Sequence, residues 1–366
     1  MLTVTDGGTF DWANMPLDDM ALGNAMDADF TLRAFNAMRK DMKKKSVHHV
    51  YDKLLKEILV VASDIEHRGI LVDNDCVARF DELLETEISD LEEKLSSLSV
   101  IDGVNPRSNA DMGLLLFTKE GFDLRAVEFS KKTKAPSISE AHLQKVAVNA
   151  TGAAKEYIEL LLKYKFRVKQ HKTYVKGVEA AVEYNEDGRV YSSYNFGNVV
   201  TGRLSCSTYA AGPKKKKGIS FHTLPRPDDN DEVNLRSMMK ADDDKVFLAA
   251  DFSQAELRVL AQCCRDKNLI EAFNSGQDLH SFTASLVFGK DAKDVTKQER
   301  QIAKSVSFLI VYGGGPNKLA EQIGKSVGYC KNIFRAYQDA FPKVFNWINF
   351  VHKFVRENGY AVSIFG

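Results

Sequence analysis

The sequence lacks several features that define whole classes of protein. Its five cysteines form no C-x-x-C pair and no histidine lies at zinc-finger spacing from them, so neither a zinc site nor a disulfide framework is indicated. No apolar run approaches the roughly 20 residues that a membrane-spanning helix needs, and the first residues have neither the basic nor the apolar region of a signal peptide. We therefore expect free thiols, a reducing compartment, a cytoplasmic location and no membrane partner.

Net charge is also missing, because 50 basic residues balance 50 acidic ones in the 366-residue chain. The overall charge therefore does not indicate a nucleic-acid partner. Locally, the basic runs at 39–45 and 214–217 are either solvated loops or loops that contact phosphate, and composition leaves both interpretations open. A chain of this length that is 44% hydrophobic can fill two or three packed cores.

Apolar periodicity predicts long helices separated by one region of different composition. Helical spacing is expected across 27–39, from about 50 to 98 with a break at 67–73, and across 153–181. The helix at 153–181 carries lysines between Tyr and Phe, which fits an amphipathic helix and a surface that follows a phosphate backbone equally well. Residues 184–217 are rich in Ser, Asn, Gly and Tyr, and they are predicted to form short strands and loops.

The apolar run at 246–250 is predicted to be a buried strand, and Asp251 follows it directly. Ser253 and Glu256 have the S-x-x-E spacing of a capping box, which predicts that a helix opens near Gln254. Asp251 would then lie in a strand-to-helix turn, where ligands bind in α/β architectures. An acid there either coordinates a hard cation such as Mg²⁺ or caps the helix, and the residues alone allow both.

A second capping box, Thr296 with Glu299, predicts a helix that begins near Lys297. One side of this helix is apolar and should face the core; it carries Ile302, Val306, Leu309 and Ile310. Four residues recur at every fourth position along the opposite side: Arg300, Lys304, Phe308 and Tyr312. Two cations followed by two aromatics suit a ligand with phosphates at one end and a planar base at the other.

These two stretches resemble motifs A and B of family A DNA polymerases, the DNA polymerase I type. Motif A is DFSQAELR (251–258), and motif B is the R-x-x-x-K-x-x-x-F-x-x-x-Y-G series that starts at Arg300. Further segments resemble that family in the same order along almost the whole chain: LVVASDIEHRGILVD (59–73), KTKAPSISEAHL (132–143), TGRLS (201–205), FHTLPR (221–226) and QDLHSFTASLVFG (277–289). The resemblance implies an α+β, mostly helical fold with right-hand polymerase architecture: a thumb, a partial palm with an antiparallel sheet, and helical fingers.

The resemblance also implies a metal-dependent reaction and names its residues. Two Mg²⁺ ions, which Mn²⁺ could replace, would join a primer 3′ oxygen to the α-phosphate of a dNTP. Asp251 and the backbone carbonyl of Phe252 would be metal ligands. Glu256 would exclude a ribose 2′-OH, and Gln254 would add a nucleotide contact. The partners would be primer–template DNA and dNTPs.

On the helix that follows Thr296, the resemblance assigns Arg300 and Lys304 to the triphosphate, with Lys304 as proton donor to pyrophosphate. His280 would contact the β-phosphate and Phe308 would pack on the sugar. The residues that would contact DNA are then Tyr312 and Gly313 at the templating base, Arg203 at the primer terminus, and Lys169 and Lys172 at thumb phosphates. With this resemblance, DNA contact becomes the preferred interpretation of the basic helix.

The sequence departs from the family pattern at five points, the last of which is motif C. Leu309 replaces the Gly that usually follows the motif B Phe, and an insertion with the 214–217 lysines follows TGRLS, where Cys206 replaces a Ser. Residues 21–35 resemble only the last exonuclease motif, with Gly23 in place of its Tyr, so no 3′→5′ exonuclease activity is expected.

The most consequential departure concerns motif C. The last eight residues, 359–366, are predicted to be a strand that begins a hairpin, and the H-D-E of motif C does not occur in the sequence. We therefore expect a split polymerase whose remaining palm comes from a second polypeptide or by splicing. A split gene suits a bacteriophage, which would place the protein in the host cytoplasm. The alternative is a non-catalytic primer–template or nucleotide-binding fragment or subunit, or a truncated product without function.

The expected domains follow the same comparison. They are an exonuclease remnant (1–45), the thumb (46–182), the first part of the palm (183–272), the fingers (273–345) and a truncated return to the palm (346–366).

Overall fold

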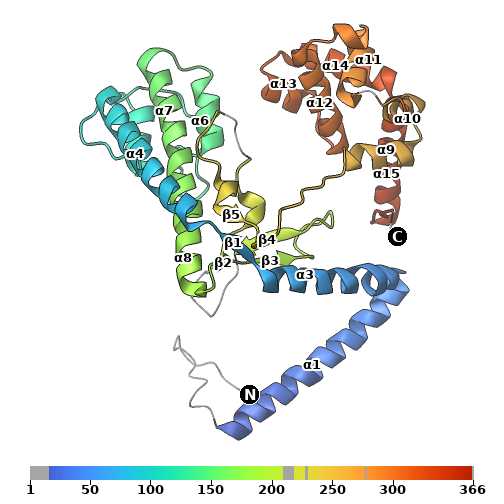
Figure 1. Ribbon diagram of the computed structural model, residues 1–366. Coiled ribbons are helices and arrows are strands. Elements are labelled where there is room, and N and C mark those ends of the chain that lie inside the picture. Colours follow the sequence, from blue (N-terminus) through green and yellow to red (C-terminus); the bar gives the residue numbers. More distant parts are fainter. Residues whose placement is uncertain (1–15, 209–217, 227–229, 277, 365–366) are drawn as a thin grey trace. The chain divides into compact units, whose positions relative to one another are not determined.

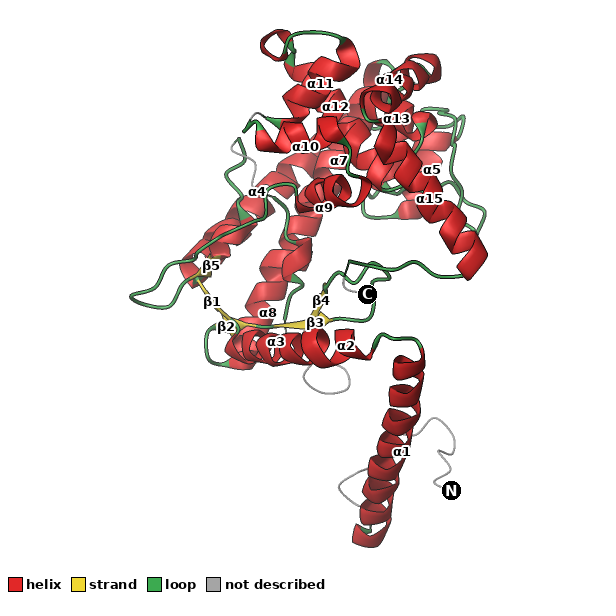
Figure 2. Ribbon diagram, turned by 90° about the vertical axis from the view of Figure 1, so that its right-hand side faces the viewer, coloured by secondary structure: helices red, strands yellow, loops and turns green. Residues whose placement is uncertain are grey.

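The computed structural model describes residues 16–208, 218–226, 230–276 and 278–364. The chain divides into two compact units, 1–247 and 248–366, and each is described here by itself (Figure 1). Helices account for most of the described chain and the few strands are short (Figure 2). The expected α+β, mostly helical fold class is thereby confirmed.

The first unit contains eight α-helices among its described residues. They are α1 (Leu17–Lys44), α2 (His48–Val50), α3 (Lys56–Arg68), α4 (Asn74–Leu98), α5 (Asn109–Phe117), α6 (Glu140–Ala147), α7 (Gly152–Lys169) and α8 (Lys176–Asn185). Two π-helical segments, η2 (Tyr51–Leu55) and η3 (Gln170–Val175), join α2 to α3 and α7 to α8. Two 3₁₀ turns are η4 (Phe221–Thr223) and η5 (Leu235–Met238).

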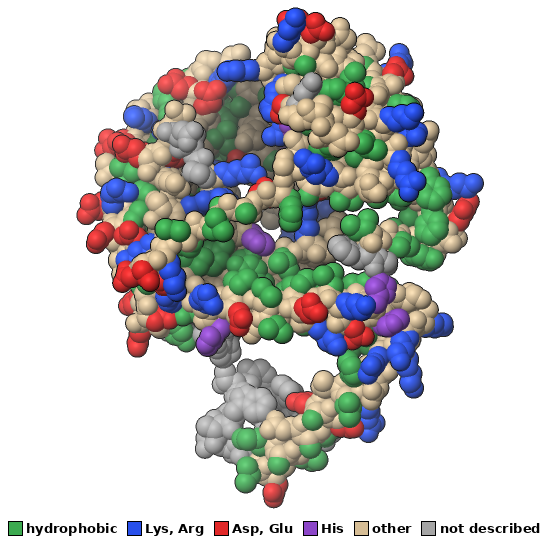
Figure 3. Space-filling view, turned by 45° about the vertical axis from the view of Figure 1, so that its right-hand side comes forward, with side chains coloured by type: hydrophobic (Ala, Val, Ile, Leu, Met, Phe, Trp, Pro, Cys, Tyr) green, Lys and Arg blue, Asp and Glu red, His purple; other side chains and the backbone are tan. Residues whose placement is uncertain are grey.

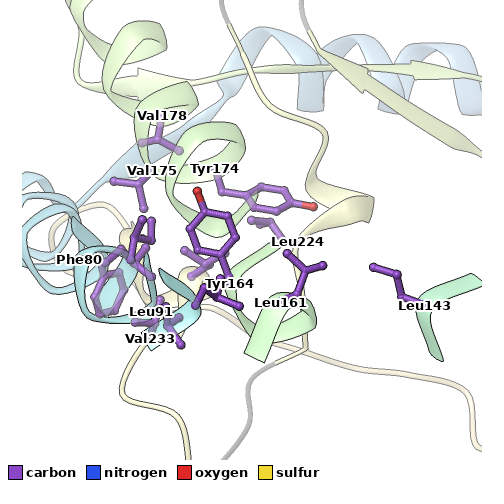
Figure 4. Close-up of a cluster of buried hydrophobic side chains, with 14 of the residues drawn as sticks. Phe80, Leu91, Leu143, Leu161, Tyr164, Tyr174, Val175, Val178, Leu224 and Val233 are labelled. Carbon is purple, nitrogen blue, oxygen red and sulfur yellow. The ribbon is translucent and has the colours of Figure 1, made fainter. Parts of the chain in front are cut away.

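Helix α4 shows how the sequence specifies this unit. Asp73 caps it, because its side chain accepts a hydrogen bond from Cys76 N at 3.0 Å. The buried positions then recur at helical spacing: Cys76, Val77, Phe80, Leu84, Ile88, Leu91 and Leu95. They pack against α7 in one core, in which Phe80 and Leu91 lie near Leu161 and Tyr164 (Figure 4).

The helix expected at 153–181 forms, but the π-helix η3 interrupts it. The wider π turn brings two polar side chains, Gln170 and His171, into the interior. There Gln170 Oε1 accepts from Arg167 Nη1 at 2.8 Å, and His171 Nε2 lies 2.6 Å from Asp81 Oδ1. Apolar periodicity carries no signal for the burial of Gln170 and His171, although η3 also buries Tyr174 and Val175.

The strands of the first unit form two small antiparallel sheets. One has the order β2-β1-β5, with β1 (Ile70–Val72) between β2 (Arg189–Val190) and β5 (Met239–Lys240). The other pairs β3 (Ser192–Asn195) with β4 (Ser205–Thr208). Strand β1 is the extended piece predicted at 67–73, and it starts after Gly69, whose φ of +59° and contact with the Tyr191 ring leave no room for a Cβ.

Two predicted strands are wrong. Residues 246–250 form no strand, and Val246, Phe247 and Leu248 are 87, 60 and 93% exposed. No strand is described at 359–364 either, where Tyr360 and Val362 are exposed. A strand needs a neighbour for its backbone groups, and the described residues supply none to these segments, so β-propensity alone does not make a strand here.

The secondary-structure elements of the second unit are all helical among its described residues. Its elements are α9 (Ala255–Cys264), α10 (Lys267–Asn274), α11 (Leu279–Phe288), η6 (Ala292–Asp294), α12 (Lys297–Val311), α13 (Pro316–Ile323), α14 (Val327–Ala340) and α15 (Pro342–Asn358). Both predictions for α12 are confirmed. Thr296 and Glu299 form the reciprocal capping box, and Ile302, Val306, Leu309 and Ile310 are buried. Helix α12 packs mainly on α11.

Three further expectations can be checked. All five cysteines are free. No helix among the described residues is long and apolar enough to cross a membrane. Charged side chains of both signs are spread over the face shown in Figure 3, in keeping with the balanced composition. The lysine run at 214–217 lies outside the described residues.

Candidate active site

The outward side of α12 forms one wall of a groove of about 390 Å³. Lys304, Phe308 and Tyr312 all line it, so three of the four residues in the predicted series share one surface. Lys318 and Gln322 from α13 line the same groove, and the sequence analysis missed both. The groove thus has two lysines, two aromatic rings and two amides, since Gln301 also lines it. Such a lining can bind a ligand that is part anionic and part planar.

The fourth residue of the series, Arg300, is fixed by an acid that the sequence analysis did not assign. Its Nε and Nη2 donate to Oδ2 and Oδ1 of Asp278, each at 2.8 Å. These hydrogen bonds hold the pKa of the Asp278 carboxyl well below its usual range and raise the pKa of Arg300. The available signal was the Asp at the helix cap of the QDLHSF segment, three residues before Ser281.

His280 lies on α11 with its ring centroid 6.2 Å from that of Phe308. It is only 5% exposed, and its Nδ1 has no hydrogen-bond partner. Burial lowers the pKa of His280; Arg300 and Lys304 lower it further, whereas Asp278 opposes them. The structure therefore brings the predicted His280 to the predicted Phe308.

The turn that carries Asp251 is far more open. Asp251 is exposed and makes no hydrogen bond or ion pair with the described residues, and Phe252 is 86% exposed. The capping box predicted for Ser253 and Glu256 is wrong. Gln254 occupies the N-cap position with a φ of +54°, and no side chain caps α9. Gln254, whose backbone is left-handed, directly precedes the first residue of α9. Ser253 is therefore one position too early to cap the helix.

Two contacts hold this turn. Arg258 Nε donates to the carbonyl of Ser253 at 2.9 Å while its guanidinium lies 4.5 Å from the centre of the Phe273 ring. Tyr312 Oη donates to Glu256 Oε1 at 2.6 Å, which joins the start of α9 to the end of α12. Glu256 is thus engaged by Tyr312 and not by a cap. The predicted Gly313 follows Tyr312 with a φ of +71° and ends α12.

Leu309, which departs from the family pattern, packs inside the second unit and is 6% exposed. Its Cδ1 lies where Gly314 has no side chain, since a Cβ on Gly314 would be 2.4 Å away. Gly314 N also donates to the Leu309 carbonyl at 2.7 Å. The missing side chain of Gly314, just after α12, therefore leaves the space that the Leu309 side chain fills.

The remaining predicted residues belong to the first unit. Lys169 and Lys172 are exposed at the end of α7 and in η3, and Arg203 is exposed in the turn between β3 and β4. Lys169 lines a groove of about 270 Å³ together with Lys165 and Phe166. Burial lowers the pKa of Lys165. Phosphate contacts by these side chains are compatible with their exposure and remain predictions.

Two places in the described chain offer oxygen donors to a hard cation. Asp251 offers exposed oxygens that no Lys or Arg within residues 16–208, 218–226, 230–276 and 278–364 pairs with. A second group of donors, Asp81, Glu85 and His171, lies in the first unit, with ligand atoms within 4.8 Å of one another. Lys176 Nζ, however, lies 2.6 Å from Asp81 Oδ2. This group is therefore already an ion-pair network, and it fits a metal less well than Asp251 does.

The chain was compared with known proteins. The model of the family DNA polymerase family A matches residues 74–366. DNA polymerase I of Chloroflexus aurantiacus is 29% identical over 358 residues, which cover 97% of this chain and 36% of that protein. DNA polymerase I of Borreliella burgdorferi is 29% identical over 362 residues, covering 96% of this chain and 36% of that protein. The chain thus spans about a third of the length of the curated relatives it matches.

A solved structure agrees with the fold. The POL domain of Pol1 from M. smegmatis, solved with DNA primer-template and dNTP, has a TM-score of 0.75 and 24% identity. The match covers 90% of this chain and 55% of that chain. With the fold and the family model in agreement, the chain belongs to DNA polymerase family A.

Proposed function

We propose that the chain catalyses template-directed 5′→3′ addition of deoxynucleotides to a primer 3′ hydroxyl by two-metal nucleotidyl transfer, once the remainder of the palm is supplied. The observation that carries this proposal is the groove on α12, where Lys304, Phe308 and Tyr312 meet, with Arg300 one turn before them. Membership of DNA polymerase family A supports the reaction class.

The predicted site residues of the second unit would have the following roles. Arg300 and Lys304 neutralise the triphosphate, and Lys304 donates the proton to the departing pyrophosphate. His280, whose pKa burial lowers, donates a hydrogen bond to the β-phosphate. Phe308 packs on the sugar. Glu256, held by Tyr312, occupies the space that a ribose 2′-OH would need.

Asp251 and the carbonyl of Phe252 would hold Mg²⁺, or Mn²⁺ in its place, and the exposed oxygens of Asp251 fit that ligand set. When bound, these ions would lower the pKa of the primer hydroxyl and offset the charge of the triphosphate. The H-D-E that would supply the second carboxylate does not occur in the sequence. We propose that a second polypeptide, or residues joined by splicing, carries it.

The first unit would hold the DNA. The thumb is proposed at 46–182, with Lys169 and Lys172 at phosphates, and the palm at 183–272, with Arg203 at the primer terminus. An exonuclease remnant (1–45), the fingers (273–345) and a return to the palm (346–366) complete the proposed domains. Primer–template DNA and dNTPs are the proposed partners, and the M. smegmatis structure was solved with both. The proposed location is the cytoplasm.

A second candidate is a non-catalytic primer–template or nucleotide-binding role. The observation that favours it is the open turn of Asp251 together with the missing H-D-E. Against it, a binding module needs neither a free metal ligand nor the Glu256 contact beside the nucleotide groove.

The test is Mg²⁺-dependent primer extension by the purified full chain, with Asp251→Ala beside it and Asp339→Ala, an exposed acid on α14, as the matched control. Primer–template binding without extension, followed by extension when a motif C polypeptide is added, is the expected result. Extension by the chain alone that Asp251→Ala abolishes would support the polymerase and overturn the second polypeptide. Binding with no extension under any complementation would favour the non-catalytic role.

A further inference from the structure

The guanidinium of Arg300 has two edges that can each form a pair of hydrogen bonds, and only one is used. Asp278 takes the side edge through Nε and Nη2, at 2.8 Å each. The planar group has five N–H donors, so the end edge, formed by Nη1 and the outer hydrogen of Nη2, is left over. No acceptor among the described residues of the second unit bonds to that end edge.

Asp278 is itself held in place by α11. Its Oδ2 accepts from the backbone N of Ser281 and from Ser281 Oγ, both at 2.8 Å, so the carboxylate caps the helix. A capping side chain has little rotational freedom, because its cap bond and its ion pair require the same rotamer. Arg300 on α12 is therefore attached to a fixed point on α11.

A second acid near Arg300 is engaged elsewhere. Glu299 Oε2 accepts from Thr296 N at 2.9 Å as part of the capping box, and its Oε1 accepts from Lys290 Nζ at 2.6 Å. Within residues 278–364, Asp278 is then the carboxylate that sets the direction of Arg300. Lys304, one turn further along α12, has no ion-pair partner in the described part of the chain.

We propose that Asp278 is a positioning residue for the triphosphate: it holds the side edge of Arg300 so that the end edge is directed at the phosphates of the incoming nucleotide. The inference rests on the proposed function, in which Arg300 and Lys304 bind the triphosphate. A long side chain that is oriented in advance loses less rotational freedom on binding. Asp278 stays bonded to Arg300 while the end edge binds phosphate oxygens, and neither bond replaces the other.

The test is a double-mutant cycle on the full chain, with Asp278→Asn and Arg300→Ala made singly and together. Asparagine retains the cap, because its carbonyl oxygen accepts from Ser281 N, but it cannot accept both Arg300 bonds. The probe is inorganic tripolyphosphate with Mg²⁺, followed by isothermal titration calorimetry and repeated with dTTP. Ser281→Ala is the control, since it removes one bond to Asp278 and leaves the Arg300 pair intact.

Asp278→Asn is expected to weaken tripolyphosphate binding by roughly five- to tenfold in the wild-type background and by less than about twofold in the Arg300→Ala background. Ser281→Ala is expected to change binding by less than about twofold. Equal losses in both backgrounds would mean that Asp278 acts only as a helix cap, and the inference would be wrong. Tighter binding by Asp278→Asn would mean that Asp278 competes with phosphate for Arg300, which would also overturn it.

The inference and the proposed function fail in different ways. If Lys304→Ala and Arg300→Ala weaken binding but Asp278→Asn does not, only the role of Asp278 is refuted. If the wild-type chain does not bind tripolyphosphate or dTTP, the nucleotide site on α12 is refuted, and the role of Asp278 with it.

Discussion

The two halves of the candidate site differ in how far the described chain prepares them. On α12, a capping box fixes the helix start, a buried face fixes its rotation, and Asp278 fixes Arg300. At the Asp251 turn, the preceding segment forms no strand, the carboxylate is exposed, and Arg258 holds the backbone only at Ser253. Residues 278–323 form the cap, the Arg300 pair and the groove of the α12 half, and Tyr312 adds a hydrogen bond to Glu256 on α9. The segment before Asp251, by contrast, forms no strand with the described residues.

This difference separates two kinds of preorganisation. A helix satisfies its backbone groups internally, so α12 can present its side chains without help from distant parts of the sequence. A strand satisfies them only through other strands, so a carboxylate at its end is positioned only when the sheet is complete. In the proposed function, α12 supplies the nucleotide contacts, and the Asp251 turn together with further palm residues supplies the metal ligands.

The largest expected effect tests this separation directly. In the polymerase completed with a motif C polypeptide, Asp251→Asn should lower primer extension on the order of a thousandfold, because one metal ligand is lost. The same variant should change tripolyphosphate binding by the chain by less than about twofold, measured by titration calorimetry. A parallel loss of binding would show that the two halves are not separable.

The next effect concerns the stability of the α12 half. Leu309→Ala should lower the free energy of unfolding by about 2–5 kcal/mol, because it opens a cavity beside Gly314. Leu286→Ala on α11 is the control. Because Leu286 is 39% exposed, this variant should lower the free energy of unfolding far less. Urea unfolding followed by circular dichroism measures both. Similar losses would mean that the α12 core is not the rigid element of the comparison.

A smaller effect is expected at the start of α12. Thr296→Ala removes the hydroxyl that accepts from Glu299 N at 3.2 Å, and it should cost about 1 kcal/mol. Thr296→Ser keeps the hydroxyl, so it should lower the free energy of unfolding by less than half as much as Thr296→Ala. If the two variants unfold at the same urea concentration, the capping box does not determine where this helix begins.

The smallest effect is a pH dependence of the same unit. Burial lowers the pKa of His280 in the folded chain relative to about 6.5 when unfolded, so the unfolded state binds a proton more readily. This contribution to stability is full above about pH 6.5 and is lost as the pH falls through the lowered pKa. His280→Gln should flatten urea unfolding midpoints between pH 7.5 and 5.5. An unchanged slope would mean that His280 is not buried in solution.

The sequence was sufficient for elements whose signals are local. The Thr296 capping box, the apolar face of α12 and a helix within 74–98 all appear where expected. It was insufficient where contacts with residues far apart in the sequence determine the local structure. The strand predicted at 246–250 does not form, because it has no pairing partner among the described residues. The π-helix η3 depends on the burial of Gln170 and His171 by residues of other helices. The family resemblance assigned the side chains on α12, but the Asp278 pair emerged only from the structure.

The exposed segment at 246–252 also has a consequence for handling the protein. It places Val246, Phe247, Leu248 and Phe252 in water, contains a single charge, and has no proline or glycine. Extended apolar segments of this kind pair with their counterparts on other molecules, so the chain should self-associate as its concentration rises. Dilute preparations, or co-expression with whatever covers this segment, should therefore give more monodisperse material than concentrated chain alone.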